Sequence, residues 1–135
     1  MKFIFTVLIL YVGVYAQATY IDRAAYLLTK TGTMKTTLTL KDCGGIEQSQ
    51  WLDCQSGDCK ALVFDNAATC DTWDCKAVTA MNPQWCMSKD CKALVQRDPY
   101  QCESQNCKAI VGQSSDSCAD HECVTLVETG SLSCE

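Results

Sequence analysis

The chain of 135 residues contains a single histidine and only two prolines. That histidine, His121, has no fixed nucleophile beside it other than serines such as Ser115 and Ser117. The carboxylates show no distinct pair set apart from the rest of the sequence. Because catalysis needs a base held close to a nucleophile or to a second titratable group, we expect no enzyme activity and no cofactor.

A basic stripe is also lacking. The lysines are spread along the chain among carboxylates, and the net charge is -5. Nucleic-acid binding depends on clustered lysine and arginine that follow the phosphate backbone, so no nucleic-acid partner is expected. No Asn-x-Ser/Thr sequon occurs, and N-glycosylation is not indicated.

Long hydrophobic runs are limited to one, from Phe3 to Val14. It follows Lys2 and precedes small residues, which is the layout of a secretory signal peptide. The run is too short to span a bilayer comfortably. We expect residues 1–16 to be a signal peptide, cleaved near residue 16 or 18, and the mature protein to be secreted, extracellular and without a membrane segment.

Cysteine is what the sequence has in abundance, and its spacing is regular. Twelve cysteines follow one another in steps that alternate eleven and five residues, which defines a sixteen-residue repeat. An even number in an exported chain indicates a disulfide framework. The cysteines are Cys43, Cys54, Cys59, Cys70, Cys75, Cys86, Cys91, Cys102, Cys107, Cys118, Cys123 and Cys134.

The repeat divides the chain into a cap, residues 17–42, and a repeat domain, residues 43–135. In the cap, Asp22 is placed to start a short helix over residues 24–28, and Gly32 to end it. The alternating residues from Thr36 to Leu40 predict a strand.

Each repeat also contains an alternating segment, as in Asp58 to Val63. Alternation would direct Cys59 and Ala61 inward and Lys60 outward, which indicates a short strand. A sixteen-residue unit suits one coil of a narrow β-solenoid. The fold class predicted from the sequence is therefore all-β, a disulfide-laddered β-solenoid with a short N-terminal helix and strand cap.

Three pairings of the cysteines fit this solenoid. Joining each cysteine to the one eleven residues later uses all twelve, and we favour it. Joining across the five-residue step leaves Cys43 and Cys134 at opposite ends. Equivalent cysteines of adjacent coils could also pair, because the coil spacing matches the Cα separation of a disulfide.

The cysteine ladder resembles the insect disulfide-stabilised β-solenoid antifreeze proteins. The resemblance covers Cys43 to Cys134 and implies a rigid secreted coil. In that family, threonines flank the inward cysteine of each strand and form the ice-binding array. Here those positions hold residues such as Asp58 and Lys60, so the ice-binding residues do not carry over.

Columns of equivalent residues define a candidate interaction face. Carboxylates beside lysines would form an exposed ion-pair ladder. An apolar column next to them would be either a ridge for self-association or docking of a partner, or part of the core. The face consists of Lys60, Lys76, Lys92 and Lys108 with Leu62, Val78, Leu94, Ile110 and Leu126.

Other ligands are less favoured by the sequence. Zinc sites use closer cysteine spacing, and an oxidising compartment removes the thiolates, so no metal is expected. Trp85 and Tyr100 could form a local carbohydrate site, but we favour packing within loops as the role of these scattered aromatics. We expect a secreted rigid module that acts by surface display, by self-association or with an extracellular protein. The alternatives are an ice-binding protein and a small defence or inhibitor-type protein.

Overall fold

The computed structural model describes residues 20–30, 34 and 36–132. Within these residues the chain is helical and contains no strand. One helix covers residues 20–30. Short α-helices then alternate with 3-10 helices in the order α2 (Leu40–Glu47), η1 (Trp51–Asp53), α3 (Gly57–Phe64), η2 (Ala67–Thr69), α4 (Trp73–Ala80), η3 (Pro83–Trp85), α5 (Lys89–Gln96), η4 (Pro99–Gln101), α6 (Gln105–Gly112), η5 (Ser115–Ser117) and α7 (His121–Thr129).

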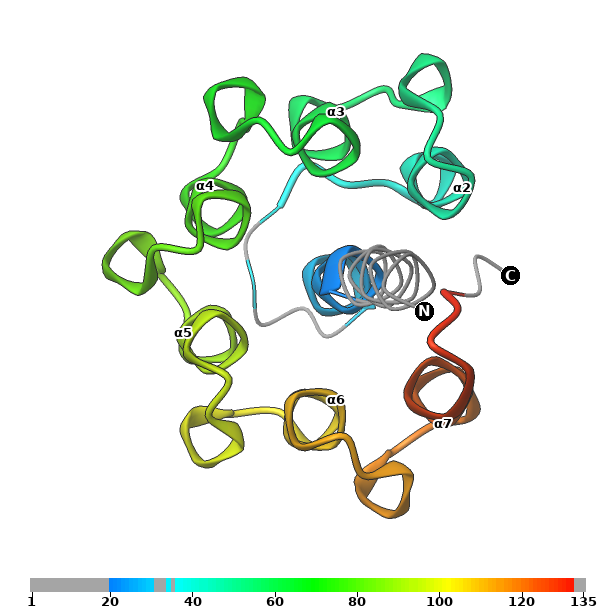
Figure 1. Ribbon diagram of the computed structural model, residues 1–135, viewed down its shortest axis with the longest axis vertical. Coiled ribbons are helices and arrows are strands. Elements are labelled where there is room, and N and C mark those ends of the chain that lie inside the picture. The colour runs from blue at the N-terminus through cyan, green and yellow to red at the C-terminus, as the bar shows by residue number, and fades with distance from the viewer. Residues whose placement is uncertain (1–19, 31–33, 35, 133–135) are drawn as a thin grey trace, which may run out of the picture.

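The repeats form an arc around the N-terminal helix (Figure 1). The helices from α2 to α7 follow one another along the arc, η1 to η5 lie on its outer side, and helix 20–30 lies inside it. Each α-helix contacts the next one and the flanking 3-10 helices. One sixteen-residue unit is therefore an α-helix, a turn, a 3-10 helix and the return to the next α-helix.

Local signals at both ends of the unit explain why it is helical. Ser56 caps α3, because its Oγ accepts a hydrogen bond from the Cys59 N–H at 3.1 Å. Thr72, Ser88, Ser104 and Asp120 cap the later α-helices in the same way. Four of the helices end in a left-handed residue with φ between 53° and 57°, namely Asp65, Met81, Arg97 and Gln113.

The core lies between the arc and the enclosed helix. In α3 the buried residues include Cys59, Ala61 and Leu62, a spacing that places them on the inner face of a helix. Equivalent residues are buried in the neighbouring repeats. Residues 24–28 of the N-terminal helix are at most 1% exposed, so this helix fills the interior of the arc and does not cover its end.

The disulfides follow the five-residue step. They join Cys54 to Cys59, Cys70 to Cys75, Cys86 to Cys91, Cys102 to Cys107 and Cys118 to Cys123, with Cα atoms 5.4 to 5.7 Å apart. Each bridge ties the end of a 3-10 helix to the start of the next α-helix. Cys43 is also disulfide-bonded. Cys134 lies outside the described residues, and the pairing across eleven residues is wrong for the five bridges seen here.

The predicted β-solenoid is wrong, and with it the architectural resemblance to the insect antifreeze proteins. Residues 36–39 are irregular and Leu40 begins α2, so the predicted cap strand is absent from this described segment. The helix predicted over residues 24–28 is confirmed, although Asp22 lies within it and does not start it. The signal-peptide prediction and Gly32 fall outside the described residues.

Candidate functional site

Buried aspartates at the helix starts connect one repeat to the next. Asp74, near the start of α4, accepts hydrogen bonds from the Met87 N–H at 2.6 Å and the Ser88 N–H at 3.3 Å, and from the Ser88 hydroxyl at 2.9 Å. Ser88 in turn accepts from the Cys91 N–H and caps α5. Equivalent contacts to the next repeat are made by Asp42, Asp58 and Asp90.

These carboxylates are at most 1% exposed, so the predicted ladder of exposed ion pairs is wrong at these positions. Burial raises the pKa of Asp42, but hydrogen bonds from Gln55, Ser56 and Thr39 outweigh it and hold the pKa below its usual value. Among the described residues, backbone and hydroxyl donors stabilise the buried charge, and the ion pair found there, Lys30–Glu122, does not involve these aspartates. The role of this row is to join repeats.

At the last junction the carboxylate lies at the capping position and its hydrogen-bonding partner at the aspartate position. Asn106 occupies the aspartate position and Asp120 the capping position. The Asn106 Nδ2 donates to the Asp120 carboxylate at 2.6 Å, and the Asn106 Oδ1 accepts from the Ala119 N–H at 2.8 Å. Since only one member of each pair is a carboxylate, the junction avoids repulsion between two like charges.

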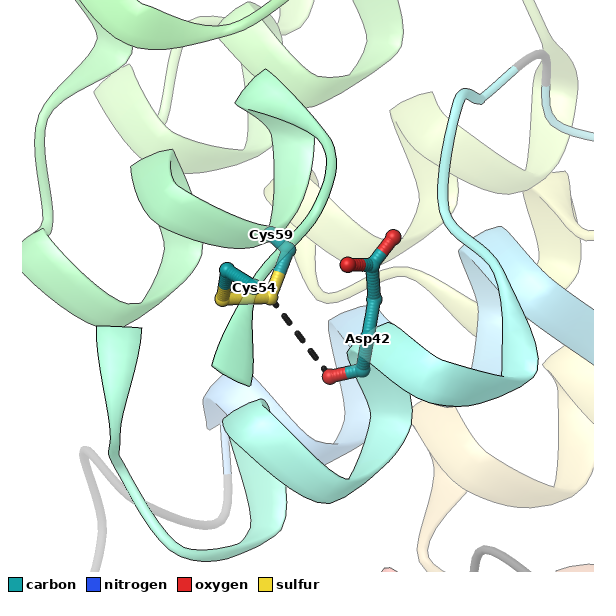
Figure 2. Close-up of side chains that lie close together, drawn as sticks. All are labelled: Asp42, Cys54 and Cys59. Carbon is teal, nitrogen blue, oxygen red and sulfur yellow. Dashed lines mark hydrogen bonds between the residues drawn. A yellow bond between two sulfur atoms is a disulfide. The ribbon is translucent and has the colours of Figure 1, made fainter. Parts of the chain in front are cut away.

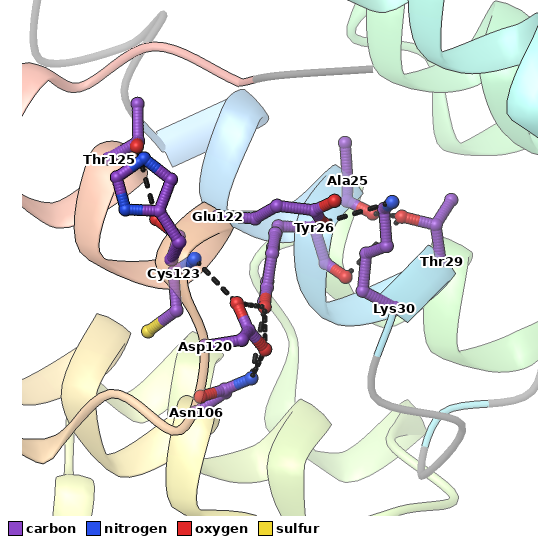
Figure 3. A network of polar contacts seen from close by, with 10 residues as sticks. Ala25, Tyr26, Thr29, Lys30, Asn106, Asp120, Glu122, Cys123 and Thr125 are labelled. Carbon is purple, nitrogen blue, oxygen red and sulfur yellow. Dashed lines mark hydrogen bonds and ion pairs between the residues drawn. The ribbon is translucent and has the colours of Figure 1, made fainter. Parts of the chain in front are cut away.

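This junction also anchors the enclosed helix (Figure 3). The Tyr26 hydroxyl contacts both carboxylate oxygens of Asp120 at 3.1 Å and accepts from Asn106 Nδ2 at 2.9 Å. One turn later, Lys30 forms an ion pair with Glu122 at 3.0 Å. Burial, followed by the hydrogen bond to Asp120, raises the pKa of Tyr26, so its hydroxyl stays protonated as a donor.

Metal binding at the aspartates can be tested from the donor atoms. In four repeats an aspartate oxygen and two cysteine sulfurs lie within 4.8 Å of one another. Figure 2 shows one such group, where the Cys54–Cys59 bridge lies beside Asp42 and the Cys59 sulfur is 3.5 Å from the Asp42 carbonyl oxygen. A disulfide sulfur is not a thiolate, and the carboxylate oxygens already accept hydrogen bonds. The donor set does not fit a zinc site.

The predicted interaction face is divided by the helical geometry. Its apolar members Leu62, Val78, Leu94, Ile110 and Leu126 are at most 3% exposed, so the reading of this column as part of the core is correct and the exposed ridge is wrong. The lysines lie nearer the surface: Lys60 and Lys76 are half-buried, and Lys92 and Lys108 are exposed. A helix turns about 100° per residue, so residues two apart, such as Lys60 and Leu62, do not share one face as the strand prediction assumed.

Aromatic side chains form clusters on the surface. Trp73, at the start of α4, packs edge to face against Trp85 of η3 with ring centroids 6.4 Å apart. The Lys76 amine lies 4.7 Å from the Trp73 ring centroid. Met87 follows Trp85 by two residues and is 73% exposed. We refer to Trp73, Lys76, Trp85 and Met87 as the tryptophan patch.

The other aromatic and titratable candidates stay apart. Trp85 pairs with Trp73 and not with Tyr100, which is 95% exposed on η4. Trp51 packs on Phe64 with centroids 5.6 Å apart. His121 is exposed at the start of α7. The sequence reasoning missed the aspartate junctions, although the recurring Asp and Ser/Thr fourteen residues apart were a detectable signal.

Comparison with protein-family models, with curated proteins and with solved structures gives no match. Among the helices of the described residues, none has the length and apolar character needed to span a bilayer. The five disulfides are consistent with an extracellular protein.

Proposed function

We propose that this protein is a secreted, disulfide-bridged helical module that binds an extracellular protein through the tryptophan patch and performs no catalysis. Secretion is supported by the apolar N-terminal run together with the disulfides. Binding in place of catalysis is supported by the carboxylates, which are occupied in joining repeats.

The observation that carries the proposal is the exposure of two adjacent tryptophans, Trp73 at 55% and Trp85 at 42%. Such rings supply much of the binding energy when a protein partner covers them. The fold does not require them. Positions equivalent to Trp73 hold Gly57, Lys89, Gln105 and His121, and those equivalent to Trp85 hold Asp53, Thr69, Gln101 and Ser117.

The test compares immobilised wild-type protein with the double variant Trp73→Ser/Trp85→Ser. Each is exposed to extracellular fluid of its source, the captured protein is identified, and its affinity is then measured with purified components. Loss of one or both tryptophans should weaken binding by at least tenfold. Interface tryptophans typically contribute about 2 kcal/mol or more to the binding free energy. A change of about 1.4 kcal/mol corresponds to a factor of ten in affinity.

Tyr100→Ser is the matched control, because Tyr100 is an exposed aromatic residue outside the patch. It should leave the affinity unchanged. Equal capture by wild type and the double variant, or no capture by either, would contradict the proposal. Sedimentation of wild type at rising concentration shows whether the captured partner is a second copy of the chain.

A further inference from the structure

A cleft of about 450 Å³ lies between helix 20–30 and the ends of the neighbouring repeats. This volume is within the roughly 300 to 1,000 Å³ typical of small-molecule sites. The Tyr20 hydroxyl donates to the Val78 carbonyl at 2.9 Å and so fixes the enclosed helix against α4 at the cleft. The accessible lining residues that matter for its chemistry are Tyr20, Ile21, Ala80, Met81 and Arg97; Leu62 and Val78 lie behind them and are at most 3% exposed.

The chain has only two arginines, Arg23 and Arg97. Arg97 lines the cleft directly, at the left-handed residue that ends α5. Arg23 follows Tyr20 by three residues, so the two side chains share a face of the helix. The Arg23 Nε is buried without a hydrogen-bond partner.

Neither guanidinium forms an ion pair with a described residue. The ion pair found among these residues is Lys30–Glu122. Asp65 also lines the cleft but is exposed and does not pair with Arg97. Burial and then the nearby Arg97 lower the pKa of Arg23, which agrees with two cations close together. A buried donor without a partner, such as the Arg23 Nε, costs free energy, and an anion held between it and the exposed Arg97 would supply the missing partner.

We propose that this cleft binds a long-chain carboxylate, with its apolar tail against Ile21, Ala80 and Met81 and its head held by Arg97, which lines the cleft, and by Arg23 beside it. Arginine presents several N–H donors in a planar fork that matches a carboxylate. The apolar wall selects an aliphatic tail over a free inorganic anion. This site is separate from the tryptophan patch, so the two proposals can fail independently.

The test measures binding of dodecanoate by calorimetry, below its micelle concentration, with dodecanol as the neutral probe. Wild type should bind dodecanoate at least tenfold more tightly than dodecanol. Arg97→Gln and Arg23→Gln should each weaken dodecanoate binding about tenfold, the effect of one charge-assisted hydrogen bond, and leave dodecanol unchanged. Lys108→Gln is the control for loss of a distant positive charge.

A second variant tests the place of the tail. Ala80 is an exposed residue lining the cleft, and Ala80→Trp should fill the space and remove binding of both probes. A circular dichroism spectrum equal to that of wild type establishes that each variant is folded. The proposal would be overturned if dodecanoate binding were undetectable or if the two probes bound with equal affinity. It would also be overturned if neither arginine variant changed dodecanoate binding, or if Ala80→Trp left binding unchanged.

Discussion

Replacing Asp74 by asparagine and Ser88 by aspartate would give the α4–α5 junction the arrangement that Asn106 and Asp120 already have. In wild type the Asp74 carboxylate is 1% exposed and lies 2.9 Å from the Ser88 hydroxyl. Ser88→Asp alone would place two carboxylates in one buried site. At pH 7 one of them would have to take up a proton or remain repelled, which costs at least about 3 kcal/mol.

The other single change is milder. Asp74→Asn keeps an oxygen for the Met87 and Ser88 N–H groups and presents an amide N–H to a hydroxyl that can accept. Losing the charged acceptor costs about 1 to 2 kcal/mol. The double variant restores one carboxylate per junction and should return to within about 1 kcal/mol of wild type, so the coupling is at least about 3 kcal/mol.

Guanidinium unfolding with intact disulfides measures these free energies, and the flanking Trp73 and Trp85 report on the junction by fluorescence. Ser88→Asp should recover stability as the pH falls towards 4, because the shared site then takes up its proton at less cost. Additivity of the two single changes within about 0.5 kcal/mol would refute the account of the junction.

Three further predictions concern the enclosed helix and the first repeats. Burial and the nearby Glu47 raise the pKa of Asp22 from 3.8 to about 6. The stability that this carboxyl contributes below pH 4 should therefore decrease as the pH rises through 6. Asp22→Asn should remove this loss in melting curves, and a pH profile unchanged from wild type would contradict the prediction. Tyr26→Phe removes the hydroxyl shared with Asp120 and should cost about 1 to 2 kcal/mol in denaturant unfolding, whereas no loss would mean that the contact is not stabilising. Gly57→Ala would place a Cβ 2.5 Å from the Thr69 carbonyl oxygen and should lower the free energy of unfolding by about 1 to 3 kcal/mol. Gln105→Ala at the equivalent position is the control and should change it by less than about 0.5 kcal/mol. Equal effects of the two variants would show that the close approach does not matter.

The cysteine period identified the repeat, and the alanine-rich run 24–28 identified a helix, but neither determined the secondary structure of the repeat. The segment from Asp58 to Val63 has only six residues. This is too short for the hydrophobic pattern to distinguish a strand from a helix. The deciding signal was the hydroxyl of Ser56, three residues before Cys59, which caps a helix. The same signal recurs at Thr72 and Ser88.

The burial of Asp74 could not be read from its own position. A carboxylate is usually exposed unless it is paired, and its partners are backbone N–H groups thirteen and fourteen residues away. Similarly, the cleft needs helix 20–30 to lie inside the arc (Figure 1). Contacts between distant segments decide both features: the repeat pattern shows that the aspartates recur with a Ser or Thr fourteen residues later, but not that they are buried, and it does not indicate the cleft.

The disulfide pairing tests the helical repeat most directly. The unreduced protein is unfolded at mildly acidic pH, to prevent exchange, and digested with trypsin. Cleavage after Lys60 and Lys76 then yields the peptide 61–76, which contains Cys70 and Cys75. Our account predicts its release as a single peptide, two hydrogens lighter than the reduced form. Recovery of this peptide linked to the segments on either side, as pairing across eleven residues requires, would contradict it.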